Sequence, residues 1–463
     1  MRFVQFIKRG PIGGALLSAV ALTVPTGASA ETISGALAKA YLINPRLNAQ
    51  RADNRAVDEN LPAAYGQFRP TVASTADAGI LREYVAGSQP RYQSRLITHP
   101  IGVNLSVSQN VFNGFKSVNS VYLAKSQILS ARGALRSEEA DVLYNAAVAY
   151  VSVLRDGAIV NLRHSNVDVL LQQLANTQDR LEGGEVTRTD LSQARAALSQ
   201  GRADAASAEI ILQNSIASYR LWINDTPKSL APAMVLDSLV PRSEREAIRI
   251  AVTEHPLVQA SRSNVESAAF SVKIAESQLD PTLGVVGALS QRANDGGAEH
   301  QRIYSAGISA QLSVPIYEGG IAYAAVRQAK EQLGEARLLS DQQVLQVQSQ
   351  VQSCWGSWSN ARTVATAARA QTKASEDALA GVREEAKFGQ RTTLDILNAQ
   401  QYLVNARVSY ITAQANLIIS SYCVLSSVGR LSADTLGLHV PHYDPGIHLD
   451  DVKYKAIGLE PGK

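Results

Sequence analysis

The sequence predicts a mainly α-helical protein that also contributes strands to a membrane β-barrel. Three observations support this fold class. The chain is an internal duplication, each copy contains segments in which apolar and polar residues alternate, and each copy ends in a long stretch without proline. Such alternation is typical of β-strands, whereas a proline-free stretch permits long helices. Together they favour four strands per chain, followed by long helical hairpins.

The first thirty residues have the pattern of a secretory signal peptide. An apolar stretch from Ile12 to Val24 follows the basic residues Arg2, Lys8 and Arg9, and small residues come after it at 28–30. Without this segment the 44 basic residues fall by three to 41, which equals the 41 acidic ones. We therefore expect no nucleic-acid partner. No later segment has the roughly 18 consecutive apolar residues of a membrane-spanning helix.

The duplication is visible in markers that recur at a nearly constant displacement. The displacement is 211 residues for the early markers and 205 for the later ones. The paired markers are Asn44-Pro45 with His255-Pro256, Pro70 with Pro281, Gly114 with Gly319, and Gly184 with Gly389. The change in displacement places a length difference between Pro70 and Gly114.

After the signal peptide at 1–30, the chain divides into a first repeat at 31–226, a proline-bearing linker at 227–242, a second repeat at 243–431 and a tail at 432–463. Each repeat is expected to contain a helix, a two-strand hairpin and a long helical hairpin, in that order. The expected strand hairpins are 71–112 and 282–317, and the expected helical hairpins are 117–222 and 320–430.

The strands are indicated by a period of two. Every second residue is apolar or aromatic from Tyr304 to Ile316, and again from Ile101 to Val107, while the residues between are small or polar. Strands of about ten residues match the tilted strands of membrane barrels. A half-buried sheet in a soluble domain would alternate in the same way, so the flanking helices decide in favour of the barrel.

The helices are indicated by apolar residues that recur at steps of four and three. This stripe runs through Val347, Val351, Cys354, Trp358, Ala361, Ala365 and Ala368, and the first copy repeats it at Val142, Ala146, Ala149 and Val153. Such a stripe is typical of a coiled-coil seam. A single helix from Ser117 to Leu181 would be about 100 Å long at 1.5 Å per residue.

Four strands cannot close a barrel, and open sheet edges cannot face lipid. Several chains must therefore associate, and we favour three because a twelve-stranded barrel leaves an aqueous lumen. Gly114 and Gly319 mark the junctions where strands pass into long helices. Gly184 and Gly389 mark the far turns of those helices, which are the distal tips of the molecule.

The residues Gly389-Gln390-Arg391-Thr392-Thr393-Leu394-Asp395-Ile396-Leu397-Asn398-Ala399, matched in the first copy by Gly184 to Asp190 and by Ala194, resemble the tip motif of the TolC-type outer membrane channels. The chain looks most similar to type I secretion members from alphaproteobacteria, partly through the tail segment Tyr443-Asp444-Pro445. The resemblance implies a homotrimer with a twelve-stranded barrel, a long α-helical barrel and a mixed α/β equatorial belt.

This resemblance also implies location, function and partners. Such channels sit in the Gram-negative outer membrane, extend into the periplasm and serve as the exit duct of tripartite efflux or type I secretion machines. They work with a periplasmic adaptor, or membrane fusion protein, and an inner-membrane pump of the RND or ABC type. The cargo, drugs or proteins, is left open.

The family pattern further implies a gate at the tips. Arg391 and Asp190 would link neighbouring helical hairpins and hold the periplasmic end shut, with Thr189 beside them. Asp395 would point into the lumen at its narrowest place. Many members carry a second acidic residue where this chain has Asn398, so cation selectivity is expected to be weaker here.

The tip residues also have a simpler interpretation. Thr187-x-x-Asp190 and Thr392-x-x-Asp395 fit the capping pattern of a helix start, and capping is compatible with a gate. In the tail, His439, His442 and His448 match no zinc spacing, so a solvated tail that rests on the equatorial belt is expected there. Cys354 is expected to be a small core residue, while the role of Cys423 and any pairing of the two are left open.

Catalysis has no support in the sequence. Phosphate-binding loops, metalloprotease motifs and nucleophile elbows are missing, so we expect neither an enzyme nor a cofactor or metal site. Two rival functions stay open. One is a periplasmic coiled-coil adaptor or scaffold, which the duplicated hairpin argues against. The other is a passive porin, which has no need of long helices.

Overall fold

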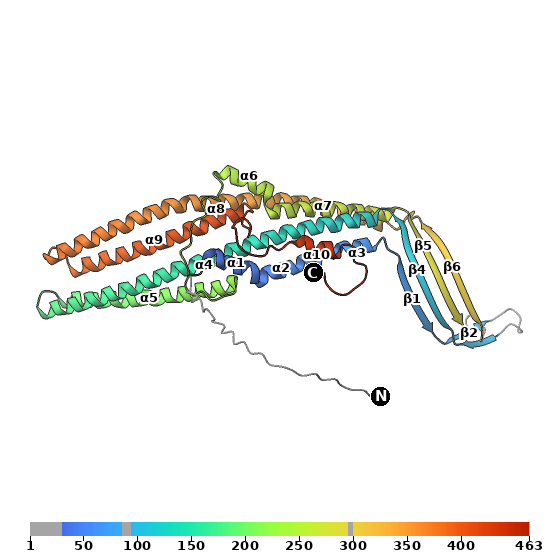
Figure 1. Ribbon diagram of the computed structural model, residues 1–463, viewed down its shortest axis with the longest axis horizontal. Helices are drawn as coiled ribbons and strands as arrows, with labels where there is room; N and C mark the ends of the chain where they lie inside the picture. Colours follow the sequence, from blue (N-terminus) through green and yellow to red (C-terminus); the bar gives the residue numbers. More distant parts are fainter. Residues whose placement is uncertain (1–29, 86–93, 295–299, 463) are drawn as a thin grey trace, which may run out of the picture.

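The computed structural model describes residues 30–85, 94–294 and 300–462. The expected signal peptide lies outside these residues, except for Ala30. The molecule is elongated, with a β-sheet at one end and, at the other, the two turns that connect the paired long helices (Figure 1). The long helices between them run nearly the whole length of the molecule.

Both repeats begin with short helices, continue through strands and end in a long helical hairpin. The first contains α1 (Ile33–Ile43), α2 (Pro45–Asp58), α3 (Asn60–Gly66), β1 (Thr71–Ala78), β2 (Leu81–Val85), β3 (Ser94–Thr98), β4 (Ile101–Asn113), α4 (Lys116–Glu182) and α5 (Arg188–Ile223). The second contains α6 (Glu244–Glu254), α7 (Pro256–Glu276), β5 (Thr282–Ala293), β6 (Arg302–Ser313), α8 (Ile321–Lys387) and α9 (Thr393–Ser427), and α10 (Pro445–Val452) follows in the tail. The long helices α4 and α8 have 67 residues each.

The Asn44-Pro45 and His255-Pro256 markers start equivalent helices. Asn44 caps α2, because its Oδ1 accepts a hydrogen bond from the backbone N–H of Arg46 at 2.9 Å. His255 caps α7 through Nδ1, which accepts from the N–H of Leu257 at 3.2 Å. In both helices the proline occupies the first helical position, where its missing N–H costs nothing. A shared capping function therefore explains why the markers recur.

The four-stranded sheet has the order β1-β4-β5-β6, and every pairing is antiparallel. The β4–β5 pairing joins the two repeats. The expected hairpin at 71–112 is interrupted, because β1 ends at Ala78 and a separate two-stranded sheet, β2–β3, follows it. The second repeat passes from β5 to β6 over a shorter connection, which accounts for the changed displacement between the markers.

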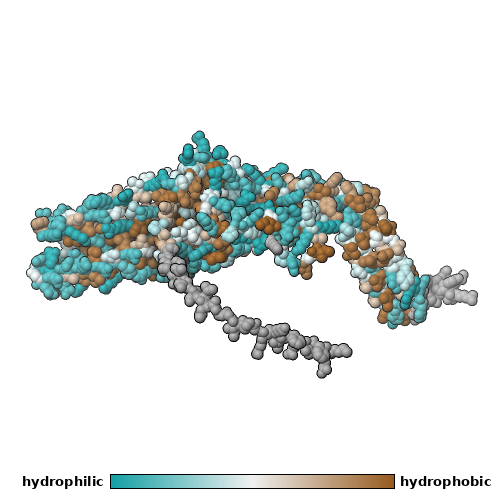
Figure 2. Space-filling model, in the orientation of Figure 1, coloured by the Kyte–Doolittle hydropathy of each residue, from teal (hydrophilic) through white to brown (hydrophobic). Residues whose placement is uncertain are grey.

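The register sorts the side chains of this sheet onto two faces, because direct antiparallel partners point to the same side. One face carries the apolar rows Val72, Val107, Gly287, Ile308 and Ser74, Leu105, Leu289, Ala306. The other carries the polar or small rows Thr75, Asn104, Ser290, Ser305 and Ala73, Ser106, Ala288, Gly307. Val72, Leu289 and Ile308 are exposed, so no helix covers the apolar face. Figure 2 shows hydrophobic residues gathered over the strands.

Two helical hairpins, α4–α5 and α8–α9, run side by side and meet through α9 and α4. The expected seam is buried in both copies, at Val142, Ala146 and Ala149 and at Val347, Val351 and Cys354. The largest core cluster lies at the base of the hairpins, where α1, α4, α5 and α9 meet. In the described parts of the chain, α9 alone is long and apolar enough to cross a membrane, yet it packs between α8 and α4.

The structure settles two questions about the tail and the cysteines. Cys354 and Cys423 form a disulfide that joins α8 to α9. The expectation of a solvated tail is wrong for His448, which is buried on α10 with its Nδ1 3.2 Å from a carboxylate oxygen of buried Asp58. The pairing arises because α10 packs on α2. His439 and His442 lie before α10 in the tail and take no part in this pairing.

Candidate gate at the helix tips

Each helical hairpin turns through a glycine in the left-handed backbone region. Gly184 has φ of +78° in the first turn, and Gly389 has φ of +74° in the second. An added Cβ would meet no atom within 4 Å at either position. Conformation rather than crowding therefore requires glycine here, since L side chains disfavour positive φ.

Both turns then start the returning helix with a capping box. At the start of α5, a carboxylate oxygen of Asp190 accepts from the backbone N–H of Thr187 at 2.9 Å and from its hydroxyl at 2.7 Å. At the start of α9, Asp395 accepts the same two bonds from Thr392, both at 2.9 Å. The capping interpretation of the aspartates is therefore confirmed, and the two tips share one design.

These hydrogen bonds stabilise the charged carboxylates. Bonds from the side chain and backbone of Thr187 lower the pKa of Asp190, and bonds from the backbone and side chain of Thr392 lower the pKa of Asp395. Each acid also lies in the first turn of its helix, where the helix dipole favours negative charge. The tips therefore keep both negative charges at any physiological pH.

The structure does not bring Arg391 and Asp190 together within one chain. Arg391 instead pairs through Nε with Glu385 of α8 at 2.7 Å, and this partner raises its pKa. The first tip has its own pair, Arg180 with Glu185 at 3.0 Å. Thr189 is exposed beside Asp190. The Arg391–Asp190 link is therefore not formed within the described chain.

Asn398 lies in a cleft between the two hairpins, one helical turn from Asp395. The cleft has a volume of about 340 Å³ and is lined from α4, α5 and α9, with Asn166, Gln193, Leu397, Asn398 and Gln401 among its residues. Because Asn398 is exposed there, it can contact solvent or a neighbouring chain.

The sequence analysis missed a contact that holds the two hairpins together near this cleft. The buried amide of Gln400 donates to the buried Asn166 side chain at 3.0 Å, beside an apolar cluster that includes Leu170 and Leu397. A buried amide pair in a helical seam fixes the register of the helices. The signal available in the sequence was Asn166 itself, a polar residue within a long helix.

The junction glycines differ from each other. Gly114 has φ of +62°, and a Cβ there would lie 2.6 Å from the Cβ of Asp280. Gly319 has φ of +63°, but nothing lies near it. Both glycines thus turn a strand into a helix, and only the first is also required by close packing.

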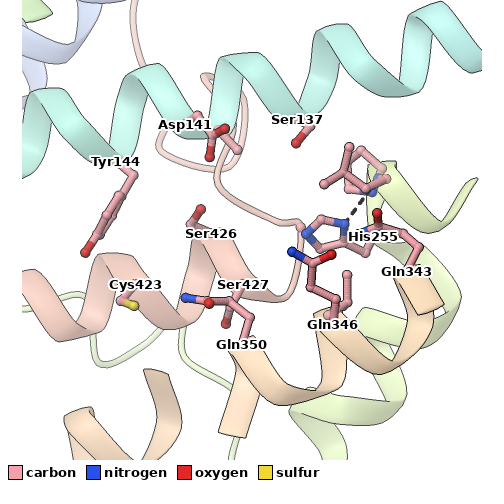
Figure 3. A pocket seen from close by; sticks show the side chains of 15 residues that line it. Ser137, Asp141, Tyr144, His255, Gln343, Gln346, Gln350, Cys423, Ser426 and Ser427 are labelled. Carbon is pink, nitrogen blue, oxygen red and sulfur yellow. Dashed lines mark hydrogen bonds between the residues drawn. The ribbon is translucent and has the colours of Figure 1, made fainter. Parts of the chain in front are cut away.

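A cavity of about 240 Å³ lies where α4, α7, α8 and α9 meet (Figure 3). His255 projects into it beside Gln343 and Gln346, and Asp141 faces it from α4. Burial lowers the pKa of His255 to about 4 and raises the pKa of Asp141. In the described ranges no group of three or more metal-ligating side chains is close enough to hold an ion.

A protein family named outer membrane efflux protein matches this chain twice, over residues 36–221 and again over residues 247–430. The chain belongs to the outer membrane efflux protein family. The two matches begin 247 − 36 = 211 residues apart, which agrees with the duplication seen in the sequence. Family membership also confirms the resemblance to TolC-type channels.

Three relatives cover between 68% and 99% of this chain. The outer membrane efflux protein BepC of Brucella suis is 36% identical and covers 99% of each chain. The outer membrane protein TolC of Escherichia coli is 22% identical over 88% of this chain and 84% of its own. The alkaline protease secretion protein AprF of Pseudomonas aeruginosa is 23% identical over 68% of each chain.

Solved structures show the same fold. The CmeC outer membrane channel of Campylobacter jejuni has a TM-score of 0.76 at 16% identity, over 86% of each chain. The open MtrE channel of Neisseria gonorrhoeae has a TM-score of 0.70 at 16% identity, over 87% of this chain and 90% of its own. These likenesses confirm the predicted fold class of long helices with a few barrel strands.

The family assignment fixes the general function and location. This protein is an exit duct of an efflux or secretion machine, placed in the outer membrane and extending into the periplasm. Its relatives are channels rather than enzymes, and members of the family form trimers that work with adaptor and pump components. The rival adaptor and passive-porin functions have no support among these relatives.

Proposed function

We propose that three copies of this chain close one twelve-stranded barrel and one continuous helical tunnel. The observation that carries this proposal is the sheet with two faces and two edges. Its apolar face is bare, and within the described strands β1 and β6 each pair on one side only. Each unpaired backbone group in lipid costs roughly several kcal/mol. The open edge of β1 in one copy must therefore pair with the open edge of β6 in the next.

The polar face of the sheet fits an aqueous lumen. An ion pair lies on it between Asp77 of β1 and Arg292 of β5, with the two atoms 3.5 Å apart across β4. Gly102 of β4 stands between them, and a Cβ there would lie 2.7 Å from the Asp77 carboxylate. A charged pair is costly to bury in lipid, so this face supports an aqueous lumen.

A tryptophan placed on either face tests the barrel. We expect Ile308→Trp to be strongly quenched by brominated lipid, because its side chain would lie in the bilayer. Ser309→Trp, the neighbouring residue on the opposite face, is the matched control and should be quenched little. Both variants should migrate as trimers in unheated electrophoresis. Equal quenching of the two variants, or a monomer that needs no detergent, would contradict the proposal.

We further propose that the tips form the gate, with Arg391 of one copy bound to Asp190 of a neighbouring copy. Glu385 occupies only the Nε of Arg391, and a guanidinium has five N–H donors in total. A second carboxylate can therefore bind without displacing the first. An exposed ion pair is weak alone, so the gate would depend on repetition of this pair around the ring.

Channel conductance tests the gate. Asp190→Asn keeps an acceptor for the Thr187 cap but removes the charge, so single-channel conductance in planar bilayers should rise. Arg391→Ala should raise it in the same way. Glu385→Gln is the control, because it removes the intrachain partner and leaves the proposed pair intact, so conductance should stay low. Unchanged conductance in the first two variants would exclude the Arg391–Asp190 gate.

We propose that Asp395 contributes one acidic ring to the lumen, and that Asn398 makes no second one. The partners proposed for the tips are a periplasmic adaptor and an inner-membrane pump of the RND or ABC type. The names of BepC and AprF, one an efflux protein and the other a secretion protein, support both classes of machine. No catalysis by the duct itself is proposed, so the energy would come from the pump.

A further inference from the structure

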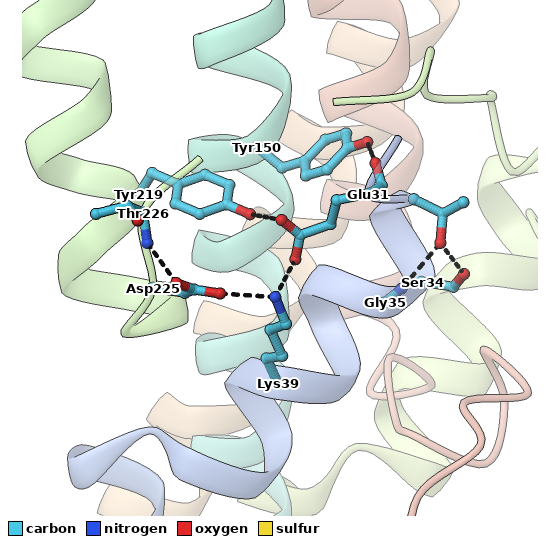
Figure 4. A network of polar contacts seen from close by, with 9 residues as sticks. Glu31, Ser34, Gly35, Lys39, Tyr150, Tyr219, Asp225 and Thr226 are labelled. Atoms are coloured by element: carbon cyan, nitrogen blue, oxygen red, sulfur yellow. Dashed lines mark hydrogen bonds and ion pairs between the residues drawn. The ribbon is translucent and has the colours of Figure 1, made fainter. Parts of the chain in front are cut away.

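A cluster of polar residues surrounds Glu31 at the base of the hairpins (Figure 4). One carboxylate oxygen of Glu31 accepts from the hydroxyl of Tyr219 on α5 at 3.0 Å, and the other pairs with Lys39 of α1 at 2.8 Å. Lys39 also binds Asp225 at 2.7 Å. The Glu31 side chain therefore connects α1 to α5.

The backbone of Glu31 is held as firmly as its side chain. Its N–H donates to the carbonyl of Ser229 at 2.7 Å, and its carbonyl accepts from the N–H of Ala231 at 2.8 Å. The hydroxyl of Tyr150 lies 2.7 Å from the carbonyl oxygens of both Glu31 and Ala231, and it donates to one at a time. These bonds attach the linker between the repeats to α4.

Glu31 supplies hydrogen-bond acceptors that this cluster needs, because Tyr150 and Tyr219 are fully buried and their hydroxyls must be paired. Burial raises the pKa of Tyr150 to about 12 and that of Tyr219 further, so both hydroxyls stay protonated. The next residue, Thr32, already caps α1. A chain that began after Glu31 would leave the two tyrosines and Lys39 without these partners.

The contacts around Glu31 are short of positive charge. Two carboxylates, Glu31 and Asp225, share one ammonium group, that of Lys39. Lys228 also acts on Asp225, but its side chain is exposed. One more cation at the Glu31 nitrogen would balance the charges in direct contact. Ala30, which precedes that nitrogen, is exposed.

We propose that, once a signal peptidase has hydrolysed the expected Ala30–Glu31 bond, the new α-ammonium of Glu31 completes this cluster as an anchor for the linker. Water gives its hydroxyl to the carbonyl carbon of Ala30 and a proton to the Glu31 nitrogen, so the step needs no other reactant. The free amine is protonated at neutral pH, since its pKa is about 8. Its bond to the Ser229 carbonyl then becomes charge-assisted, which strengthens it.

The mature protein purified from outer membranes tests the cleavage position. N-terminal sequencing and intact mass should both show Glu31 as the first residue. Any other first residue would overturn the proposal. This result is independent of the barrel and gate, because it concerns only the end of the chain.

An insertion of Gly-Gly between Ala30 and Glu31 tests the role of the ammonium. The variant keeps the Glu31 side chain but turns its nitrogen back into an amide. We expect a lower temperature of trimer dissociation and a rise of about tenfold in hydrogen exchange at the Ala231 amide, which Glu31 holds. Adding Glu31→Gln to the insertion removes the excess negative charge and should recover part of the loss.

The insertion variant must first be shown to be cleaved before the added glycines. If it then dissociates and exchanges like the wild type, the ammonium has no structural role. If Glu31→Gln fails to recover any of the loss, charge balance is not the reason for the anchor. Either result would refute the proposal even if the protein still functions as a duct.

Discussion

His255 shows how one residue can fulfil a structural function and also sense pH. It caps α7 with a neutral ring nitrogen, and burial lowers its pKa to about 4 from an ordinary value near 6.5. The unfolded chain therefore takes up a proton at a higher pH than the folded protein does. Stability contributed by the neutral ring is complete above about pH 6.5 and is lost as pH falls toward 4.

We predict that His255→Asn reduces the loss of stability in acid. Through His255 alone, the protein should be about 2 kcal/mol less stable at pH 5 than at pH 7. Asparagine can keep the cap, as Asn44 does at the equivalent helix start, but it does not titrate. Chemical denaturation at the two pH values measures the difference. Asp141 faces the same cavity, but its raised pKa acts in the opposite direction and is present in both proteins.

At the tips, single residues were predicted with mixed success. The turn glycines and the Thr–Asp caps are local features, set by backbone conformation and by spacings of three residues, and the structure has them where the sequence indicates. The partner of Arg391 was not predicted. Glu385 lies one helical turn before the tip, and a single sequence does not show which acid a long arginine side chain reaches first.

Among the larger elements, the second helical hairpin carries a crosslink that the first lacks. The disulfide between Cys354 and Cys423 joins α8 to α9 across a sequence separation of 69. The equivalent positions in the first repeat, displaced by 205, are Ala149 and Ser218. Only one hairpin is thus fastened at its base, and the periplasm is an oxidising compartment in which such a bond persists.

We predict that Cys354→Ser combined with Cys423→Ser destabilises the second hairpin. A crosslink that closes a loop of this length contributes about 4 kcal/mol through the entropy of the unfolded chain. The temperature of trimer dissociation should fall, and hydrogen exchange should rise in α8 and α9 more than in α4 and α5. A reducing agent should have the same effect on the wild type and none on the double variant. Equal exchange in both hairpins would contradict this prediction.

The strands were predicted less completely than the helices. The alternation located β4 and β6, because a face in lipid and a face in water impose a strict period of two. It did not reveal that β1 ends at Ala78 or that β2 and β3 form a separate sheet. β2 and β3 have only five residues each, so a period of two is hard to recognise in them.

For the whole molecule, the cargo can be decided by deletion. Loss of the gene should increase sensitivity to drugs if the duct serves an efflux pump, and should remove proteins from the medium if it serves a secretion system. The Asp190→Asn variant, returned to the deletion strain, should restore export. A strain unchanged in both drug sensitivity and secreted proteins would contradict a role as an exit duct.

Whole-chain features were the most predictable, because the duplication and the length of the proline-free stretches leave few architectures. The contacts within the candidate gate were less predictable. Asn166 and Gln400, which join the hairpins, lie 234 residues apart, and nothing in a single sequence pairs them. The burial of His448 against Asp58 was missed for the same reason, since it depends on how the tail returns to α2.

The internal duplication also bears on how many adaptor molecules one duct can hold. In the proposed trimer, two nearly equivalent turns per chain would form a pseudo-sixfold ring at the periplasmic end. The turns differ where Val186 and Gln193 of one stand for Arg391 and Asn398 of the other. An adaptor that contacts only the shared Gly-x-x-Thr-x-x-Asp pattern would bind in six copies. An adaptor that contacts the residues that differ between the two turns would bind in three.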